Sequence, residues 1–186
     1  MDNGASSYRR FIFGDDDSFI DIIREYKDPL ILYLNTFTNN ISVAEDLAED
    51  TFVKLVIKKP RFAGKSSFKT WLYAIGRNVA IDYLKKEGKI KKLPLEDLLE
   101  LKNEDADLER ELLKEEAGRK LHMELKRLPI EYRQVLWLRY FDGLTNKEIS
   151  EVMKKSIHNV ETLIYRAKNA LKKQLEKEKF VYEDLR

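Results

Sequence analysis

Aromatic and basic side chains alternate in one stretch of the sequence, between residues 62 and 86. The side chains concerned are Phe62, Lys65, Phe68, Lys69, Trp71, Tyr73, Arg77, Lys85 and Lys86. Aromatic rings stack on unpaired bases, at about 1–3 kcal/mol per base, while cations hold the phosphate backbone. The stretch is therefore typical of a site for single-stranded nucleic acid. The alternative is that these aromatic residues form a hydrophobic core, and we expect this of at least half of them.

A second group of polar side chains lies near the C-terminus, on what would be one face of a helix. It comprises His158, Asn159, Glu161, Thr162, Tyr165, Arg166 and Lys168. Amides and hydroxyls can bond base edges in a DNA groove, and Arg and Lys can bind guanine or phosphate. Glu161 opposes phosphate binding but could accept a hydrogen bond from cytosine. The face could bind duplex DNA, or it could be the solvated side of a structural helix.

Four carboxylates form a third group. Glu45, Asp46, Glu49 and Asp50 make two like-charge pairs at i, i+4 spacing. Each such pair costs a helix about 0.2–0.5 kcal/mol. The helix dipole favours the first pair, in the first turn, but its effect has faded at the second. This acidic face is a candidate docking surface for a basic partner, or else a solvated face with no role.

No group of residues indicates catalysis. The 186 residues include no Cys and only two His, which excludes thiol chemistry and argues against a multi-histidine metal site. Gly64-Lys65-Ser66 matches the end of a phosphate-binding loop, but the earlier glycine of such a loop would fall at Lys59. We expect no enzyme activity, no metal and no cofactor. The longest uncharged stretch, residues 29–44, is too short and too polar to span a bilayer, so we expect a cytoplasmic protein without membrane insertion.

Helices are expected to position all three groups. The chain has only 7 Gly and 4 Pro and lacks the alternating runs of strands, which predicts an all-α fold. A capping box at Ser42–Glu45 predicts a helix that ends near Lys58. Ser66 or Ser67 can then cap a second helix, which ends near Lys86.

The segment before these helices is less regular. Residues 19–27 and 30–37 have helical spacing and are expected to form one or two segments, interrupted or kinked at Pro29. Residues 1–18 are expected to be an N-terminal tail.

The C-terminal third has the pattern of a helix-turn-helix. Pro129 stops one amphipathic helix, and the next ends at Asp142 and the glycine after it. Thr145–Glu148 is a second capping box, which opens a short helix, and Ser156 can cap a longer last helix. A short helix fixed at an angle to a long one leaves the far face of the long helix free for a DNA major groove.

The charges are segregated along the chain, although the formal net charge is only +2. Residues 30–92 carry 12 basic and 6 acidic groups, and residues 119–186 carry 16 basic and 10 acidic groups. Between them, residues 93–118 carry 3 basic and 10 acidic groups. Two basic modules that face a polyanion, with an acidic connector, would explain this distribution. A solvated linker without a role would explain the acidic segment equally well.

The sequence resembles the extracytoplasmic-function (ECF) sigma factors of bacterial RNA polymerase. Residues 44–52 (AEDLAEDTF), residues 68–78 (FKTWLYAIGRN) and Asp82 are similar to region 2 of that family. Residues 128–129, Arg133, residues 143–149 (GLTNKEI), Val160 and residues 165–171 are similar to region 4. The two matches have the right order and together cover about residues 20–90 and 120–173.

The resemblance implies a subunit that binds core polymerase, recognises the −10 and −35 promoter elements and promotes DNA melting, without chemistry of its own. It implies core binding by Asp46, Glu49, Asp50 and Phe52. It implies −10 binding, with capture of an unstacked base, by Phe62, Lys65, Lys69, Trp71, Tyr73, Arg77, Asn78, Lys85 and Lys86. It implies −35 binding by Arg133, Thr145, Lys147, Ser156, His158, Asn159, Glu161, Thr162, Tyr165, Arg166 and Lys168.

The architecture implied is two small helical domains joined by the acidic linker. The boundaries we predict are an N-terminal tail (1–18), a region 2 domain (19–92), the linker (93–118), a region 4 helix-turn-helix domain (119–177) and a C-terminal tail (178–186). The partners implied are bacterial RNA polymerase core, promoter DNA and an anti-sigma factor.

Two departures from the family pattern leave details open. The turn at residues 153–156 lacks the usual glycine, and Glu161 stands where the family often has Lys or Arg, so the −35 sequence cannot be transferred. The main alternative is a helix-turn-helix regulator that binds its operator without polymerase. A third possibility is an adaptor whose acidic and apolar faces bind only proteins.

Overall fold

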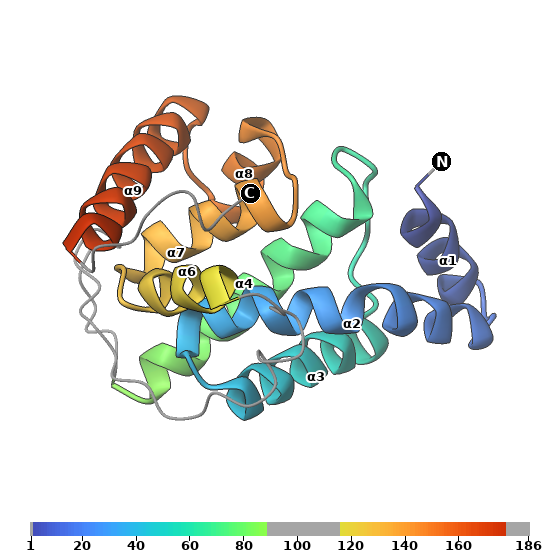
Figure 1. Ribbon diagram of the computed structural model, residues 1–186. Coiled ribbons are helices and arrows are strands. Elements are labelled where there is room, and N and C mark those ends of the chain that lie inside the picture. Colours follow the sequence, from blue (N-terminus) through green and yellow to red (C-terminus); the bar gives the residue numbers. More distant parts are fainter. Residues whose placement is uncertain (1, 89–115, 178–186) are drawn as a thin grey trace.

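The computed structural model describes residues 2–88, called here the N-terminal half, and residues 116–177, the C-terminal half. Every element within these ranges is helical (Figure 1), which confirms the predicted all-α class. The elements are α1 (Asn3–Ile12), α2 (Asp17–Thr38), α3 (Ile41–Lys58), α4 (Phe68–Lys86), α6 (Glu116–Lys126), α7 (Ile130–Leu136), the π-helical turn η1 (Trp137–Phe141), α8 (Asn146–Met153) and α9 (Ile157–Lys177). No helix of the two halves is both long and apolar enough to cross a bilayer. Most of the predicted linker (93–118) and all of the predicted C-terminal tail (178–186) lie outside the described residues.

Helices α2, α3 and α4 share the core of the N-terminal half. Gly76 sets the distance between α4 and α2, because a Cβ at this position would lie 3.1 Å from Leu30 Cδ1. Helix α2 runs through Pro29 as one helix and not as two segments. An internal proline costs a helix about 3 kcal/mol, whereas each large side chain that becomes fully buried gains about 1.5–3 kcal/mol. The apolar side chains buried directly after the proline are Leu30, Ile31, Tyr33 and Leu34.

The starts of α3 and α4 test the predicted caps. Ser67 caps α4 as predicted, since its hydroxyl accepts a hydrogen bond from the Thr70 N–H at 3.2 Å. The capping box predicted at Ser42 is wrong, because Asn40 caps α3 and accepts from the Val43 N–H at 3.1 Å. Asn40 has the extended backbone that an N-cap requires, while Ser42 already lies inside the first helical turn. Helix α3 ends at Lys58 as predicted.

The predicted N-terminal tail is instead a docked helix, α1. One oxygen of Asp2 caps the helix by accepting from the Ala5 N–H at 3.1 Å. The other oxygen accepts from the Phe68 N–H at 2.6 Å and so joins α1 to the start of α4. Tyr8 and Phe11 are 2% and 4% exposed, because they pack into the aromatic core below α1. Tyr8, Phe11 and the shared Asp2 cap therefore dock a helix that the sequence pattern did not predict.

The C-terminal half contains the predicted helix-turn-helix, formed by α8 and α9. Thr145 and Glu148 form the predicted capping box of α8. The Ser156 hydroxyl accepts from the Asn159 N–H at 3.2 Å, which confirms the predicted cap of α9. The turn between them works without glycine, since Lys154 adopts the left-handed conformation at φ 55°. Lys155 then ties the turn to α7 by an ion pair with Glu131 at 3.1 Å.

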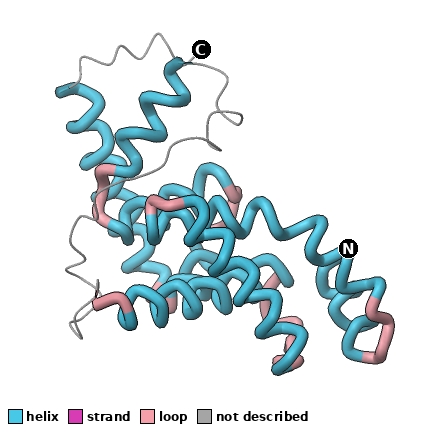
Figure 2. The backbone as a smooth tube through the Cα atoms, turned by 90° about the horizontal axis from the view of Figure 1, so that it is seen from below, coloured by secondary structure: helices cyan, strands magenta, loops and turns pink. Residues whose placement is uncertain are grey.

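The two halves pack against each other. Helix α8 lies along α4, and α7 and η1 contact α2. Two views at right angles show the C-terminal half next to α2 and α4 (Figures 1 and 2). The predicted two domains are therefore in direct contact, and this contact involves the helix that carries most of the predicted single-strand site.

Candidate nucleic-acid interface

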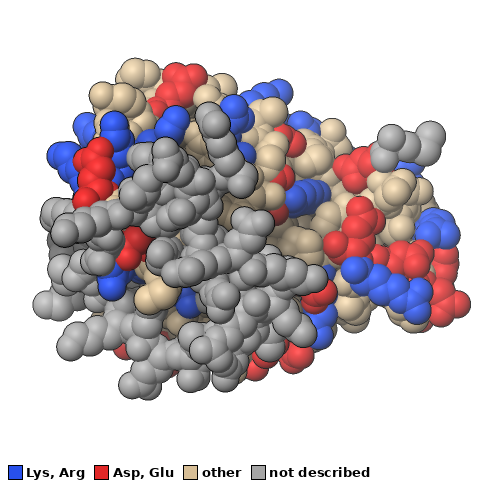
Figure 3. Space-filling model, viewed as in Figure 1, with Lys and Arg blue, Asp and Glu red and all other residues tan. Residues whose placement is uncertain are grey.

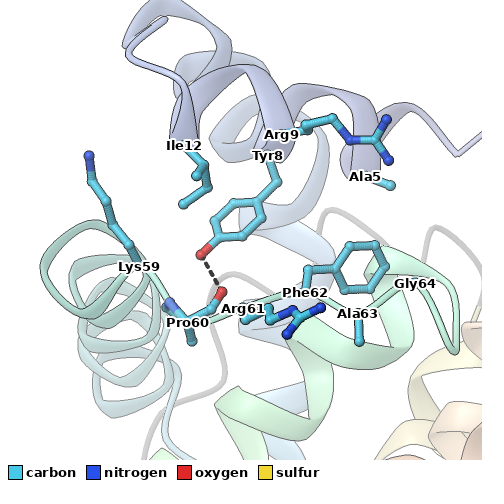
Figure 4. Close-up of a pocket in the computed structure, with 10 residues that line it drawn as sticks. All are labelled: Ala5, Tyr8, Arg9, Ile12, Lys59, Pro60, Arg61, Phe62, Ala63 and Gly64. Carbon is cyan, nitrogen blue, oxygen red and sulfur yellow. Dashed lines mark hydrogen bonds between the residues drawn. The ribbon is translucent and has the colours of Figure 1, made fainter.

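A cavity of about 330 Å³ opens between α1 and the loop that precedes α4. The Tyr8 hydroxyl crosses it to donate a hydrogen bond to the Pro60 carbonyl at 2.8 Å (Figure 4). Burial raises the pKa of Tyr8 to about 12, so the hydroxyl stays protonated and remains a donor. Three cations line the cavity with apolar neighbours; the lining comprises Ala5, Tyr8, Arg9, Ile12, Lys59, Pro60, Arg61, Phe62, Ala63 and Gly64. Such a site combines positive charge with an apolar wall.

The aromatic residues of the predicted single-strand site form a cluster beside this cavity. Phe62 and Trp71 are partly buried, and their ring centroids lie 5.2 Å apart. Phe68 is fully buried at 0% exposure, with its ring centroid 5.5 Å from that of Trp71 and 5.6 Å from that of Tyr8. Phe68 and Tyr73 therefore belong to the core, as expected for at least half of the group, while Phe62 and Trp71 remain partly accessible.

The cations predicted to bind the −10 strand differ in their access to solvent. Lys65, Lys85 and Lys86 are exposed. Lys69 is partly exposed, whereas Arg77 is only 3% exposed. Arg77 lies on the buried side of α4, one residue after Gly76, and its guanidinium is not accessible to a phosphate in this arrangement. Arg77 is therefore not part of the accessible surface of the predicted −10 site.

Side chains of the C-terminal half occupy part of the same surface. Asp142 Oδ1 lies 2.7 Å from Lys69 Nζ and accepts from the Tyr73 hydroxyl at 3.0 Å. Burial raises the pKa of the Asp142 carboxyl above its ordinary value, although the hydrogen bonds from Lys69 and Tyr73 act in the opposite direction. Burial and the neighbouring Asp142 also raise the pKa of the Tyr73 hydroxyl, which keeps it a donor.

Further along α4, Lys154 Nζ donates to Asn78 Oδ1 at 3.0 Å. Near the start of α4, Glu148 Oε1 accepts weakly from the hydroxyls of Ser67 and Thr70, both at 3.4 Å. Three separate points on α4 and its cap are therefore occupied by polar groups from α8 and the residues on either side of it.

The acidic face of α3 is solvent-exposed and has an apolar neighbour. Asp46, Glu49 and Asp50 are exposed. Phe52 does not lie on this surface, because it is 6% exposed and its ring packs edge-on to Phe19 at 6.3 Å between centroids. The exposed apolar side chains of α3 are instead Val53, Val56 and Ile57, which are 50%, 41% and 70% exposed. The predicted docking surface therefore combines three carboxylates with three aliphatic groups.

The outer face of α9 is accessible along its length. The exposed members of the predicted −35 group are His158, Asn159, Glu161, Tyr165, Arg166 and Lys168. Thr162 is partly buried, and its hydroxyl donates to the His158 carbonyl at 3.1 Å. Val160 and Ala167 are fully buried on the opposite side, which orients the polar face outward.

Three other residues of the predicted −35 group have structural roles in this arrangement. Thr145 and Ser156 are helix caps, as described above. Arg133 is 4% exposed and donates to the Lys126 carbonyl at 2.7 Å, and burial lowers the pKa of its guanidinium to about 10. Arg133 therefore ties α7 to the end of α6 and does not face a groove. Lys147 is exposed at the start of α8.

Several residues of the interface were absent from the sequence prediction. Arg9, Lys59 and Arg61 line the cavity, but α1 lies far from residues 59–61 in the sequence. Asp142 and Lys154 were assigned only to turns. Lys59 and Arg61, which precede the predicted single-strand stretch, could have been added to its cations from the sequence. Nothing in the sequence indicated that α1 would lie against them.

The surface at the α1 end of the molecule is mixed in charge. Basic and acidic side chains intermingle there (Figure 3). Arg10 accounts for part of this pattern, since it pairs with Asp15 at 3.7 Å and with Asp21 at 3.3 Å. Arg10 is therefore already paired with carboxylates and is not among the cations proposed to contact phosphate.

Comparison with known proteins identifies both halves. Residues 22–90 match the family model "Sigma-70 region 2", and residues 118–171 match "Sigma-70, region 4". The RNA polymerase sigma factor YlaC of Bacillus subtilis is 33% identical over 162 residues, which cover 87% of this chain and 94% of that protein. The ECF RNA polymerase sigma factor SigW of the same organism is 32% identical over 170 residues, which cover 87% and 91%.

Solved structures support the fold. The structure of CnrH in complex with the cytosolic domain of CnrY aligns with a TM-score of 0.66 at 21% identity, over 94% of this chain and 96% of that one. The sigma factor RpoE of Bartonella quintana, solved with the anti-sigma factor NepR, aligns with a TM-score of 0.61 at 21% identity, over 85% and 96%. Two sigma-70 regions in the family's order, and relatives above 30% identity along most of their length, establish that this chain belongs to the ECF sigma factors of the sigma-70 family, which are non-catalytic subunits of bacterial RNA polymerase.

Proposed function

We propose that this sigma factor captures the non-template strand of the −10 element at the cavity between α1 and the loop before α4. The observation that carries the proposal is the cavity itself, about 330 Å³ in volume and lined by Arg9, Lys59 and Arg61. A cavity of this size holds a single unstacked base, and the three cations can hold the phosphates on either side of it. Unstacking a base costs a few kcal/mol, which contacts with the partly accessible rings of Phe62 and Trp71 would offset.

The outer face of α9 is proposed to contact the −35 element as duplex DNA. Its exposed Asn159 and Arg166 supply the groups that bond adenine and guanine edges in the major groove. The buried Val160 and Ala167 hold the opposite side against the rest of the C-terminal half. We therefore assign −35 contacts to the exposed residues of α9 and to Lys147, and a structural role to the buried Arg133. Thr145 and Ser156 are exposed helix caps and remain predicted −35 contacts.

Core polymerase is proposed to dock on the exposed face of α3. Asp46, Glu49 and Asp50 would pair with a basic surface. Val53 and Ile57 supply apolar area that a stable protein interface needs at its centre. In this proposal, Val53 and Ile57 take the place of Phe52 in the docking surface that the sequence predicted.

The functional units are proposed to follow the predicted boundaries, with one addition. Residues 19–92 would form the core-binding and −10 unit and residues 119–177 the −35 unit, with 93–118 as the linker. Helix α1 joins the first unit, because it forms one wall of the cavity.

Since the family works on RNA polymerase, we place the protein in the cytoplasm. The solved structure of the Bartonella quintana sigma factor RpoE with the anti-sigma factor NepR supports an anti-sigma partner here as well.

Reconstituted transcription tests the proposal. The purified protein and bacterial core polymerase are mixed with DNA of the source genome, and the transcript 5′ ends are sequenced. We expect starts at a defined promoter set, and Asp50→Arg should reduce them by weakening core binding. On one such promoter, 2-aminopurine placed in the −10 non-template strand reports base unstacking, and Arg61→Glu should reduce its fluorescence change.

The matched control is Arg24→Glu, which makes the same charge reversal at an exposed position of α2 outside the cavity lining. It should leave the fluorescence change as in the wild type. Equal effects of Arg61→Glu and Arg24→Glu would show that general charge and not the cavity holds the strand. Absence of any promoter-specific start would refute the promoter contacts altogether.

A further inference from the structure

Glu161 is a carboxylate on the outer face of α9, the helix that we assign to the −35 duplex. It is the fifth residue of α9 and is exposed, one turn after His158 and one turn before Tyr165. In a helix-turn-helix, the N-terminal residues of the second helix contact base edges in the major groove. Glu161 therefore lies where α9 would meet bases, although the phosphates of a duplex repel its charge.

A hydrogen bond from α8 holds this carboxylate. Asn146, the first residue of α8, donates weakly from Nδ2 to Glu161 Oε1 at 3.5 Å. The reverse orientation of the amide would place its Oδ1 against the carboxylate, and two acceptors repel each other. In the observed orientation Oδ1 is buried without a hydrogen-bond partner among the described residues. Since a buried acceptor without a partner is unfavourable, the contact with Glu161 sets the orientation of the amide.

The position of Asn146 is itself fixed by the capping box of α8. The Thr145 N–H donates to Glu148 Oε2 at 2.9 Å, and the Glu148 N–H donates to Thr145 Oγ1 at 3.3 Å. Asn146 therefore extends from a backbone that is held on both sides. Its bond uses Oε1 of Glu161 and leaves Oε2 for a donor on the DNA.

We propose that Glu161 selects a C·G base pair in the −35 element by accepting a hydrogen bond from the cytosine N4 amino group, with Asn146 as its positioning residue. The inference rests on the proposed contact of α9 with the −35 duplex and adds the identity of one base pair. It gives a role to the position at which the family often has Lys or Arg.

The donors of the major groove favour cytosine for a carboxylate. Only the N4 amino group of cytosine and the N6 amino group of adenine donate hydrogen bonds there. Beside adenine N6 lies the acceptor N7, which repels a carboxylate but suits an amide. Glu161 should therefore prefer cytosine, whereas glutamine, which has the same shape, should prefer adenine. Guanine and thymine present acceptor oxygens, which oppose a carboxylate.

A carboxylate in this place has separate effects on affinity and on specificity. Its charge lowers the affinity for every duplex, and only a sequence with a donor within reach recovers part of this loss. A solvated Glu161 without a role would instead lower the affinity for all sequences equally. The two interpretations therefore differ in base preference and not in overall affinity.

Selection of promoter DNA by the holoenzyme tests the proposal. The chain and bacterial core polymerase are mixed with copies of one of their promoters in which the −35 base pairs are randomised, and the bound DNA is sequenced. For the wild type we expect one position with about a tenfold preference for C·G. Glu161→Gln should switch this position to A·T and leave the others unchanged. Glu161→Ala should remove the preference at this position only.

Glu176→Gln is the matched control, because it removes the same charge from the same helix. Glu176 lies 15 residues after Glu161, about 22 Å further along the axis, and pairs with Lys172 at 3.7 Å. It is outside the N-terminal turns that meet base edges, so its base preferences should equal those of the wild type. Asn146→Ala keeps the net charge and should weaken the C·G preference without raising the affinity for other sequences.

The results separate failure of this inference from failure of the proposed function. If Glu161→Gln raises the affinity for all sequences and leaves every base preference unchanged, Glu161 contacts no base and the inference is overturned. If Asn146→Ala changes only the stability of the protein, the positioning role of Asn146 is overturned. If the wild-type holoenzyme has no base preference at −35, or Arg166→Ala alters none, the assignment of α9 to this element is itself wrong.

Discussion

Replacing Gly4 by alanine should detach α1 from the body of the protein. Gly4 lies in the first turn of α1, and its φ is helical, so alanine meets no backbone obstacle there. The obstacle is steric. A Cβ on Gly4 would lie 2.5 Å from Phe68 Cδ1 and 2.6 Å from the Tyr26 hydroxyl oxygen. Favourable carbon contacts lie at about 3.5–4.0 Å, so the overlap with the Phe68 ring is roughly 1 Å.

Two effects of opposite sign decide the outcome. Alanine favours an interior helical position over glycine by about 1 kcal/mol, and by less in the first turn. Overpacking of a core costs about 1–3 kcal/mol when the neighbours cannot move. Phe68 cannot move freely, because it is 0% exposed and surrounded by other rings, including those of Tyr8, Tyr26 and Trp71. We therefore expect a net loss of about 1–2 kcal/mol, or undocking of α1.

Chemical denaturation and hydrogen exchange measure these effects. The Gly4→Ala protein should unfold at lower denaturant concentration, and the amides of α1 should exchange faster than those of α2. Because α1 forms one wall of the cavity, −10 strand binding should weaken as well. Ser6→Ala is the matched control, since Ser6 is exposed on the same helix and alanine should stabilise it by a few tenths of a kcal/mol. A Gly4→Ala protein with undiminished stability and protected α1 amides would refute the packing argument.

Two further predictions concern buried and titratable groups. The Tyr33 hydroxyl is buried without a hydrogen-bond partner among the described residues, whereas that of Tyr73, on a ring stacked 4.9 Å away, donates to Asp142. Tyr33→Phe should therefore stabilise the protein by about 1 kcal/mol, and Tyr73→Phe should destabilise it by a similar amount. Urea titrations measure both changes. Equal effects of the two substitutions would contradict the assigned hydrogen bonds. Although partial burial favours the neutral form of Glu148, hydrogen bonds from Thr145, Ser67 and Thr70 lower the pKa of this carboxyl. The stabilising effect of the Glu148 carboxylate should thus be complete above the ordinary Glu pKa of about 4.3 and should disappear as pH falls through the lower folded-state pKa. The wild type should therefore lose its stability advantage over Glu148→Gln in acid. An advantage that persists at pH 2 would exclude the carboxylate as its source.

The local parts of the fold could be predicted because they depend on neighbours in the sequence. Ser67 and Thr145 cap helices through groups three residues away, and both predictions are confirmed. The helix-turn-helix follows from the spacing of apolar residues in the last two helices. The cap at Ser42 failed because Asn40 competes for the same role two residues earlier, and the choice between them depends on backbone geometry.

By itself, the sequence determined the helical class, the family and the positions of the polar faces, because periodicity and capping are local and the family motifs are contiguous. Tertiary structure alone decided which side chains of those faces are accessible. Phe52 is buried against Phe19, which lies 33 residues earlier in the chain, and α1 lies against the loop before α4 to form a cavity. The pairing of Asp142 with Lys69, 73 residues away, is likewise invisible to any local pattern, since it depends on how two folded units meet.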